Sequence, residues 1–376
     1  MTGPAARGGR PARVGVLVND DGALAAGGGD EAVAASLEAA TAIAAALGRA
    51  GLDVALVRAP GDPAALLAAV RAADAACWFN LCESLRGDAR LEAAVAWLLE
   101  LEGVAYTGSP PRALALALEK PLCRAALREA GVPVPRGAVL ALPDDPLVGP
   151  APPRPGRPWI VKPAREDASH GVALESVVTG EAAARARAAW VIETFRQPAL
   201  VEEWIDGREL NVSLLERPGA EDPDGALEVL PLAEIDFSAW PAGAPRVVTY
   251  DAKWRPDSPE YRGSPSVAAG PLEPALAARV REVARAAFRA VGLRDYGRVD
   301  LRLCAADGPL VIDVNPNPDL SPDAGLARAA ARGGLSHDDL CRTIVDRALA
   351  RRALARREAG APAGEPARAA APARAR

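Results

Sequence analysis

Two stretches near the end of the chain place carboxylate and amide oxygens at alternate positions. Asp300 lies in GRVDLRL, and Asp313 and Asn315 lie in VIDVN, with apolar residues between the polar ones. Because side chains alternate across a strand, each stretch predicts a strand whose polar residues share one face. If residues 306–309 form the turn between them, Asp300 lies opposite Asn315, and Asp313 is its diagonal neighbour. We therefore expect two carboxylates and an amide oxygen on one patch of a hairpin.

Such a patch suits a magnesium ion. Carboxylates this close repel one another unless a cation lies among them, and Mg²⁺ is usually held by one or two carboxylates together with substrate phosphates. The open alternative is a salt-bridged sheet surface in which Arg298 and Arg302 pair with the aspartates. A metal site of this kind requires a phosphate group nearby, so the cations of the chain become important.

Lysine is rare in this chain: of its 44 Lys and Arg residues, only Lys120, Lys162 and Lys253 are lysines. A lysine kept where arginine is otherwise used indicates a need for a compact ammonium group, although survival by chance is the alternative. Lys162 ends an apolar stretch and precedes the loop AREDASHG, whose backbone donors could bind a phosphate beside it. His170, in the same loop, either contacts a substrate or lines the loop.

Two glutamates flank the short connection EEWIDGRE. The carboxylates of Glu202 and Glu209 could accept hydrogen bonds from an amino group or from ribose hydroxyls, and Trp204 and Ile205 could form an apolar slot for a base. Surface charge and core packing are the alternatives for each residue taken alone.

The predicted elements that position these residues alternate between strands and helices in the first part of the chain. Strands are predicted at 13–18, 53–59, 76–81 and 104–108, and helices at 31–49, 63–72 and 89–102. This alternation indicates a parallel, Rossmann-like sheet. Farther along, we predict helices at 113–130, interrupted at Pro121, and at 273–291, and strands at 158–164 and around a turn at Asp206-Gly207 within 199–215. The run Gly27-Gly28-Gly29 lacks the dinucleotide-binding spacing, so we predict a flexible loop there.

The composition excludes several classes of function. The chain has 376 residues and a formal charge of −5, which gives no sign of nucleic acid as a partner. No apolar run reaches the ~18 residues of a membrane helix, and the first residues lack the apolar segment of a signal peptide. The five cysteines form no CxxC pair, so we expect free thiols in a reducing cytoplasm.

Eight stretches of the sequence resemble, in this order, motifs of the ATP-grasp carboxylate–amine ligases, and most closely those of the D-alanine–D-alanine ligase group. No single motif is decisive, but eight in the same order over residues 75–345 make chance improbable. The matching stretches are FNLCESLRGD…LE (79–92), GVAYTGSPPRALALALEKPLCR (103–124), GVPVP (131–135), IVKPAREDASHGV (160–172), VEEWIDGREL (201–210), YDAKW (250–254), GRVDLR (297–302) and VIDVNPNPDLSP (311–322).

The resemblance implies an α/β and α+β fold: an N-terminal Rossmann-like domain followed by a two-subdomain ATP-grasp unit that clamps ATP. We divide the chain on this basis. The predicted parts are a disordered segment (1–12), the Rossmann-like domain (13–112), the small ATP-grasp subdomain (113–205), the large one (206–350) and a basic low-complexity tail (351–376).

The resemblance also implies a role for individual residues, with ATP and Mg²⁺, or Mn²⁺ in its place, as cofactors. All three lysines would contact the nucleotide, Glu202 and Ile205 the adenine, and Glu209 the ribose. The implied metal ligands are Asp300, Asp313 and Asn315, and the implied catalytic residues are Arg298, Lys253 and Ser169. The implied substrate contacts are Glu31, Glu83, His170, Trp254 and Asp319.

The implied reaction joins a small-molecule carboxylate to a small-molecule amine. The γ-phosphoryl group of ATP moves to the carboxylate, because phosphate is a better leaving group than hydroxide, and metal ions and lysines neutralise the charge. The amine then attacks the acyl phosphate while Arg298 stabilises the developing oxyanion. The loop 165–171 is expected to close over the phosphates and exclude water.

The sequence departs from the dipeptide ligases on the substrate side. Their Leu-His-Gly is Leu81-Cys82-Glu83 here, and their glycine-serine-serine loop is Asp167-Ala168-Ser169. Trp254 stands where the dipeptide ligases have a tyrosine after their substrate-side lysine. Asp319 replaces the glycine of their last motif, and Ala324 replaces a later serine. We therefore expect a ligase with a different acceptor. The charges of Glu83 and Asp319 favour a cationic acceptor if both residues face its pocket, and the equal alternative is that both are surface residues or lie behind the residues that contact the substrate.

Three alternatives remain open at this point. The chain could be a true D-alanine–D-alanine ligase, an ATP-grasp phosphotransferase, or a nucleotide-binding protein without turnover. The oligomeric state is also open, with a homodimer as one expectation, whereas no nucleic-acid or membrane partner is expected.

Overall fold

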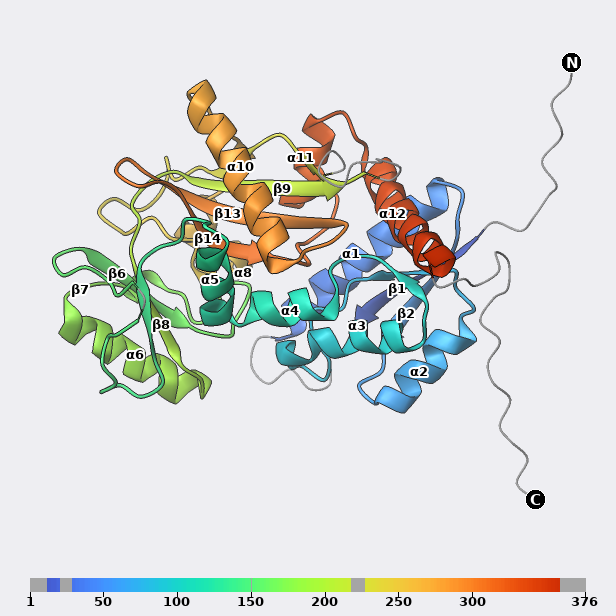
Figure 1. Cartoon of the computed structure of the whole chain (residues 1–376), viewed down its shortest axis with the longest axis horizontal. Helices are drawn as coiled ribbons and strands as arrows, with labels where there is room; N and C mark the ends of the chain where they lie inside the picture. The colour runs from blue at the N-terminus through green and yellow to red at the C-terminus, as the bar shows by residue number, and fades with distance from the viewer. Residues whose placement is uncertain (1–11, 21–28, 150, 218–226, 359–376) are drawn as a thin grey trace, which may run out of the picture.

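The computed structural model describes residues 12–20, 29–149, 151–217 and 227–358, and the strands in these ranges form three sheets (Figure 1). The molecule is elongated, with a parallel sheet at one end, a small antiparallel sheet at the other and the largest sheet between them. The predicted segment 1–12 lies outside the described residues except for Ala12, and of the glycine run only Gly29, the first residue of a helix, is described.

The N-terminal sheet is parallel, as its alternating pattern predicts. Its strand order is β2-β1-β3-β4, so the buried β1 lies between β2 and β3. The strands are β1 (Arg13–Asn19), β2 (Asp53–Ala59), β3 (Cys77–Asn80) and β4 (Ala105–Tyr106). The helices are α1 (Gly29–Arg49), α2 (Pro63–Ala72) and α3 (Glu92–Leu101), the last preceded by the 3₁₀ turn η1 (Ala89–Leu91).

The small sheet is antiparallel, with the order β5-β8-β6-β7, and α6 covers one face of it. Trp159, Val161 and Val201 of the strands pack with Ala188 and Val191 of the helix in one apolar core. The elements are β5 (Gly137–Leu140), β6 (Pro158–Pro163), η2 (Leu174–Ser176), β7 (Val177–Thr179), α6 (Glu181–Phe195) and β8 (Ala199–Glu203).

The large sheet has the order β12-β11-β9-β13-β14, with β10 also paired to β9. The predicted amphipathic helix is confirmed as α10, which buries Val280, Val283 and Val291 against this sheet and ends at Gly292 in the left-handed conformation. The remaining elements here are β9 (Glu209–Glu216), β10 (Leu227–Val229), β11 (Ala233–Ile235), α8 (Tyr250–Trp254), α9 (Pro259–Arg262), β12 (Ser266–Ala268), α10 (Pro274–Val291), β13 (Tyr296–Cys304) and β14 (Gly308–Asn315).

The helix predicted at 113–130 is two helices, α4 (Pro111–Leu118) and α5 (Lys120–Glu129), and they separate at Glu119. Pro121 has no N–H to donate to the preceding turn, so a continuous helix cannot pass through it, whereas the first turn of a new helix tolerates it. As a result Lys120 begins α5, and its backbone N–H donates to Ala164 O at 3.0 Å. This bond places the lysine beside the end of β6.

The two strands predicted within 199–215 are confirmed, but they belong to different sheets: β8 to the small one and β9 to the large one. The turn between them is therefore the crossing from one sheet to the other. A Cβ atom on Gly207 would lie 1.9 Å from Leu303 O, so only glycine fits where the crossing runs beside β13.

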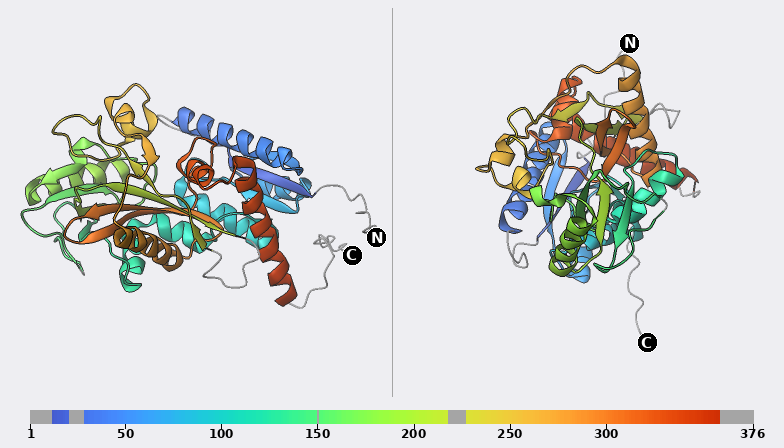
Figure 2. Two further views of the ribbon diagram at one scale, coloured as in Figure 1. Left: turned by 90° about the horizontal axis from the view of Figure 1, so that it is seen from above. Right: turned by 90° about the vertical axis from the view of Figure 1, so that its left-hand side faces the viewer.

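Two pairs of helices pack against a different domain from the one to which the sequence assigned them. Helices α4 and α5 share a core with α10 and the large sheet, and the C-terminal α11 (Gly325–Arg332) and α12 (His337–Glu358) share one with the N-terminal sheet. Both figures show α12 beside that sheet (Figures 1 and 2). The domain boundaries stay a proposal, and the tail expected from residue 351 is helical to Glu358; its remainder lies outside the described residues.

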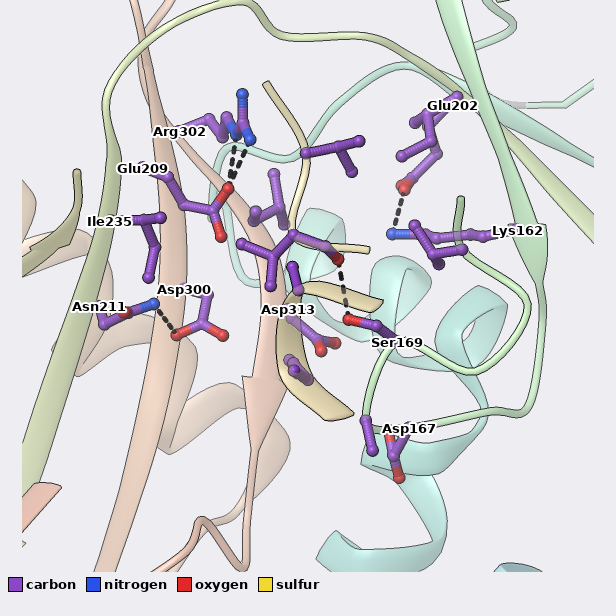
Figure 3. Close-up of a pocket in the computed structure, with 18 of the residues that line it drawn as sticks. Lys162, Asp167, Ser169, Glu202, Glu209, Asn211, Ile235, Asp300, Arg302 and Asp313 are labelled. Carbon is purple, nitrogen blue, oxygen red and sulfur yellow. Dashed lines mark hydrogen bonds and ion pairs between the residues drawn. The ribbon is translucent and has the colours of Figure 1, made fainter. Parts of the chain in front are cut away.

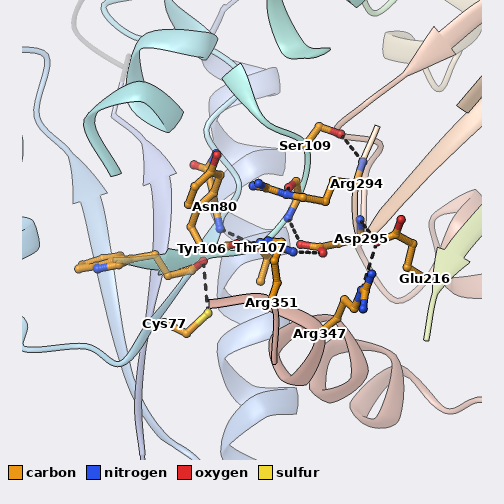
Figure 4. A network of polar contacts seen from close by, with 12 residues as sticks. Cys77, Asn80, Tyr106, Thr107, Ser109, Glu216, Arg294, Asp295, Arg347 and Arg351 are labelled. Atoms are coloured by element: carbon orange, nitrogen blue, oxygen red, sulfur yellow. Dashed lines mark hydrogen bonds and ion pairs between the residues drawn. The ribbon is translucent and has the colours of Figure 1, made fainter. Parts of the chain in front are cut away.

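A buried aspartate just before β13 connects helix α12 with the segment that follows β4 of the N-terminal sheet (Figure 4). Asp295, which is fully buried, accepts a hydrogen bond from Gly108 N at 2.8 Å and forms an ion pair with Arg351 of α12. One turn earlier, Arg347 pairs with Glu216 of β9 at 3.2 Å. Within the described residues, no helix is long and apolar enough to cross a membrane.

Candidate active site

One pocket is lined by residues of both the small and the large sheet (Figure 3). All three lysines of the chain, Lys120, Lys162 and Lys253, line it. The predicted residues that also line it are Ser169, His170, Glu202, Ile205, Glu209, Arg298, Asp300 and Asp313. Residues spread over nearly two hundred positions of the chain are thus brought together, as the sequence predicts.

The hairpin that carries the aspartates differs from prediction in its register. Asp300 pairs with Asp313, and Arg298 pairs with Asn315, two residues away from the expected alignment. The chain reverses over three residues, 305–307, and not four, and a β-bulge adds Ile312 to β14. Because the shift is two residues, the aspartates keep the same face and still converge.

Asp300 accepts hydrogen bonds from three side chains. Arg298 donates from Nε at 2.7 Å and from Nη2 at 2.9 Å, Asn211 from Nδ2 at 2.9 Å, and Asn315 from Nδ2 at 3.1 Å. The salt-bridge interpretation is therefore right for Arg298 and wrong for Arg302, which pairs with Glu209. Because Asn315 directs its amide nitrogen to Asp300, its oxygen is the atom left for a ligand.

Asp313 lies among cations. Lys120 Nζ is 3.7 Å from Asp313 Oδ1 and 3.1 Å from Asp167 Oδ1. Burial of Asp313 opposes its ionisation, but Lys120 and Lys162 outweigh burial and hold the pKa of this carboxyl well below its usual range. Burial likewise opposes the charge on Lys120, and the two aspartates outweigh it and raise the pKa of this lysine.

The donor set fits a divalent cation that shares its ligands with a phosphate. Two facing carboxylates and one amide oxygen are too few to complete the coordination of Mg²⁺. In the described part of the chain, no group of three or more His, Cys, Asp or Glu side chains could hold a metal ion alone. The lysines around Asp313 supply the positive charge that a polyphosphate needs.

Glu202 is held by two cations at the small-sheet side of the pocket. Lys162 Nζ lies 2.9 Å from Glu202 Oε2, and Arg124 Nε lies 2.7 Å from Glu202 Oε1. Burial opposes ionisation, but Arg124 and Lys162 together lower the pKa of Glu202 to about 2. Both oxygens are engaged, so the carboxylate can accept a bond from a base only if one of these contacts opens.

The loop after β6 is closed onto the segment that leads into α8. Ser169 Oγ donates to Val248 O at 2.9 Å, and Trp254 Nε1 donates to Ala168 O at 3.1 Å. Ala168 and Ser169 both have positive φ, 52° and 62°, which is rare for residues other than glycine. These contacts hold a strained loop over the pocket, with the His170 ring 5.1 Å from the ring of Tyr250.

Several predicted substrate residues lie outside the lining of this pocket: Glu83, Trp254 and Asp319. Asp319 is exposed and accepts bonds from Ser321 N and Oγ at 2.8 and 2.6 Å. Glu83 is exposed, but desolvation of its carboxyl group and the nearby charges of Asp319 and Asp167 raise its pKa to about 7. The side chain of Glu31 lies outside the described residues, so its predicted contact is not described.

The sequence did not predict Asn211, which lines the pocket and donates to Asp300, or Arg124, which pairs with the lining residue Glu202. Arg124 follows Lys120 by four residues, one helical turn, and Asn211 follows Glu209 by two residues on a strand. These spacings place each on the same face as a predicted residue, which is the signal that could have identified them.

Comparisons with known proteins agree on one family. The family model described as "D-ala D-ala ligase C-terminus" matches residues 151–346. A D-alanine–D-alanine ligase of Acidiphilium cryptum is 31% identical over 330 residues, which cover 88% of this chain and 98% of that protein. The uncharacterized protein y4sG of Sinorhizobium fredii is 34% identical over 272 residues, covering 71% of this chain and 73% of that protein.

A solved structure shares the fold. The crystal structure of D-alanine–D-alanine ligase from Bacillus anthracis complexed with ATP matches with a TM-score of 0.68 and 19% identity. The match covers 92% of this chain and 99% of that one. The predicted fold class is therefore confirmed.

Proposed function

The chain belongs to the D-alanine–D-alanine ligase family, and from this premise we propose that it is an ATP-dependent ligase that joins a carboxylate to an amine. The observation that carries the proposal is the convergence of the only three lysines with Asp300 and Asp313 on one pocket. Cations gathered around paired carboxylates suit a nucleoside triphosphate bound with a divalent metal.

The lysines and the hairpin would bind the phosphates. We assign Lys120, Lys162 and Lys253 to the phosphate groups, and Asp300, Asp313 and Asn315 to the metal. Mg²⁺, when bound, would neutralise charge on the transferring phosphoryl group. Since Lys162 and Lys120 already have carboxylate partners, we expect each to exchange part of that contact for a phosphate oxygen.

The base and sugar would lie at the other end of the pocket. Ile205, Ile235 and Val247 line that end with apolar surface, and Glu209 lines it with a buried carboxylate. An apolar slot with one carboxylate beside it suits a purine base followed by a sugar with hydroxyl groups. We therefore assign Ile205 to adenine and Glu209 to ribose.

The chemistry follows from this placement. A substrate carboxylate oxygen attacks the γ-phosphorus of ATP, and ADP leaves, which gives an acyl phosphate. The amine attacks the acyl carbon, phosphate leaves with one of the former carboxylate oxygens, and an amide remains. Arg298 would stabilise the oxyanion of the second step, and the loop that holds Ser169 would exclude water.

The amine acceptor is the finer part of the proposal. Glu83, Asp167 and Asp319 raise the negative potential on the substrate side, since both aspartates contribute to the raised pKa of Glu83. This charge favours a cationic acceptor. The second candidate is D-alanine as acceptor, as in the named relatives, which one observation favours: the 31% identity extends over 88% of the chain. We place either reaction in the cytoplasm, consistent with five described cysteines that form no disulfide.

A screen of paired substrates tests the proposal. Phosphate release is measured over pairs of amino acids and amines, D-alanine with itself included, and the products are identified by mass spectrometry. An amide formed with one ADP per product supports a ligase. A phosphorylated final product would indicate a phosphotransferase, and ATP binding without acceptor-dependent phosphate release would indicate a protein without turnover.

A further inference from the structure

Arg302 is a fully enclosed arginine at the base and sugar end of the pocket, with an exposed fraction of 2%. From β13 it donates through Nη1 to Ile205 O at 3.1 Å, and through Nη2 to Arg246 O. Its guanidinium also lies 4.4 Å from the ring centroid of Trp204. The Arg302 side chain thus connects Ile205, in the crossing between the two sheets, with Arg246, in the loop on the other side of the pocket.

The same arginine fixes one oxygen of Glu209 and leaves the other open (Figure 3). Its Nε and Nη2 both donate to Glu209 Oε2, the former at 3.0 Å. Glu209 is 7% exposed, and among the described residues no donor is found for Oε1, which points away from Arg302. Because Glu209 lines the pocket, this oxygen can accept a hydrogen bond from a ligand there, and a hydroxyl group of the ligand would supply one.

Arg302 also supplies positive charge directly beside the carboxylate of Glu209. A lone buried carboxylate close to a polyphosphate would be repelled and would be costly to desolvate. The guanidinium of Arg302 donates two hydrogen bonds to Glu209 Oε2 and lies over the ring of Trp204. These contacts hold the Arg302–Glu209 pair in one orientation. Lysine cannot reproduce both contacts, because it carries a point charge on a flexible stem.

We propose that Arg302 is a positioning residue that presents Glu209 Oε1 to the sugar hydroxyls and so makes the pocket selective for ribonucleotides over deoxynucleotides. This inference rests on the proposed binding of ATP in the pocket. A hydrogen bond to a charged acceptor corresponds to about a 10- to 100-fold preference for the nucleotide that carries the hydroxyl.

The proposed role of Arg302 is tested by isothermal titration calorimetry, which measures the affinity of the full chain for ATP, 2′-deoxy-ATP and 3′-deoxy-ATP in the presence of Mg²⁺. We expect the wild type to bind ATP about 10- to 100-fold more tightly than at least one deoxy analogue. In Arg302→Met the ATP affinity should fall to that of the analogue, so that the preference drops to about twofold or less. Arg208→Met, which breaks the exposed pair with Glu234 outside the pocket, is the matched control and should keep the full preference.

The outcomes separate the inference from the function it rests on. Absence of ATP binding by the wild type would overturn both. If the wild type binds ATP but does not distinguish the analogues, or if a folded Arg302→Met keeps the preference, the inference alone is wrong. Should Arg302→Met not fold, Arg302→Lys replaces it: a several-fold smaller preference supports the proposal, and an unchanged one overturns it. A role in stability alone would lower the melting temperature and leave the preference intact.

Discussion

Asp300 and Asp313 are directly opposite each other on the paired strands β13 and β14, so their carboxylates project from the same face of the sheet. Such a pair is stable only with positive charge around it. Arg298 supplies it for Asp300 through two hydrogen bonds, and Lys120 supplies it for Asp313 at 3.7 Å.

Replacing Asp313 with Asn should lower ligase activity by about 100-fold or more, because it removes a charge that a metal ion requires at the phosphoryl group. Activity measured against Mg²⁺ concentration should also show a weaker dependence on the metal. Asp307→Asn, in the turn of the same hairpin, is the control and should behave as the wild type. An unchanged rate in Asp313→Asn would refute the metal assignment.

Lys162 should contribute to nucleotide binding more than to folding. It lies 2.9 Å from Glu202 and burial lowers its pKa, so the ammonium group lacks the solvation that it would gain from a phosphate. We expect Lys162→Met to weaken ATP binding by about 10- to 100-fold. Arg185→Met, on α6 outside the pocket, is the control. Equal ATP affinities in the two variants would contradict the phosphate assignment.

Arg124 should be important for stability. It is buried with Glu202, and removing one member of a buried pair costs about 3–5 kcal/mol. We therefore expect Arg124→Met to lose about that much free energy of unfolding in urea at pH 7. The lowered pKa of Glu202, about 2, adds stability that is complete above its unfolded value of ~4.3 and disappears as pH falls toward 2.

The double variant Arg124→Met, Glu202→Met provides the control for this pair. It removes Arg124 together with Glu202 and leaves only Lys162, which lines the pocket with a 13% exposed side chain, without this carboxylate, so it should recover part of the lost stability. Its stability should also vary less than that of the wild type between pH 5 and about 2. If the double variant is as unstable as the sum of the single ones, the pair is not the cause.

Acceptor binding should depend on pH through Glu83. Because the pKa of this carboxyl is raised to about 7, it is neutral below that pH and ionised above it. A cationic acceptor binds the ionised form, so its KM should fall as pH rises from 6 to 8, by about 2- to 5-fold for an exposed pair. Glu83→Gln should remove this dependence and leave the KM for ATP unchanged. A KM independent of pH in the wild type would argue against a cationic acceptor.

The loop over the pocket should protect the acyl phosphate from water. Trp254→Phe keeps an aromatic ring but removes the hydrogen bond to Ala168 O. We expect the strained loop to open more often, so that a larger share of the ATP is hydrolysed without product. The measured quantity is phosphate released per amide formed. Trp190→Phe, on α6 away from the pocket, should leave that ratio at the wild-type value.

The sequence predicts much of this site because its patterns are local. Strand alternation identifies the shared face of Asp300 and Asp313, and the rarity of lysine identifies three positions that one pocket brings together. Both signals come from neighbouring residues or from composition. Neither depends on how distant parts of the chain pack.

The errors concern features that tertiary contacts decide. The hairpin register depends on a three-residue turn and a bulge at Ile312, which the alternation pattern does not specify. The role of Arg302 could not be predicted, since its partner Glu209 is 93 positions away on β9. The packing of α12 against the N-terminal sheet likewise depends on contacts such as the Asp295–Arg351 pair.

The most direct test of the central claim follows an oxygen atom. The carboxylate substrate identified by the screen is labelled with ¹⁸O in its carboxyl group and incubated with ATP, Mg²⁺ and the amine acceptor. The proposed ligase predicts that each amide formed is matched by one ADP and by one phosphate that carries a single ¹⁸O, because the carboxylate oxygen leaves with the phosphate. Phosphate without label, or an amide formed without ADP, would contradict the account.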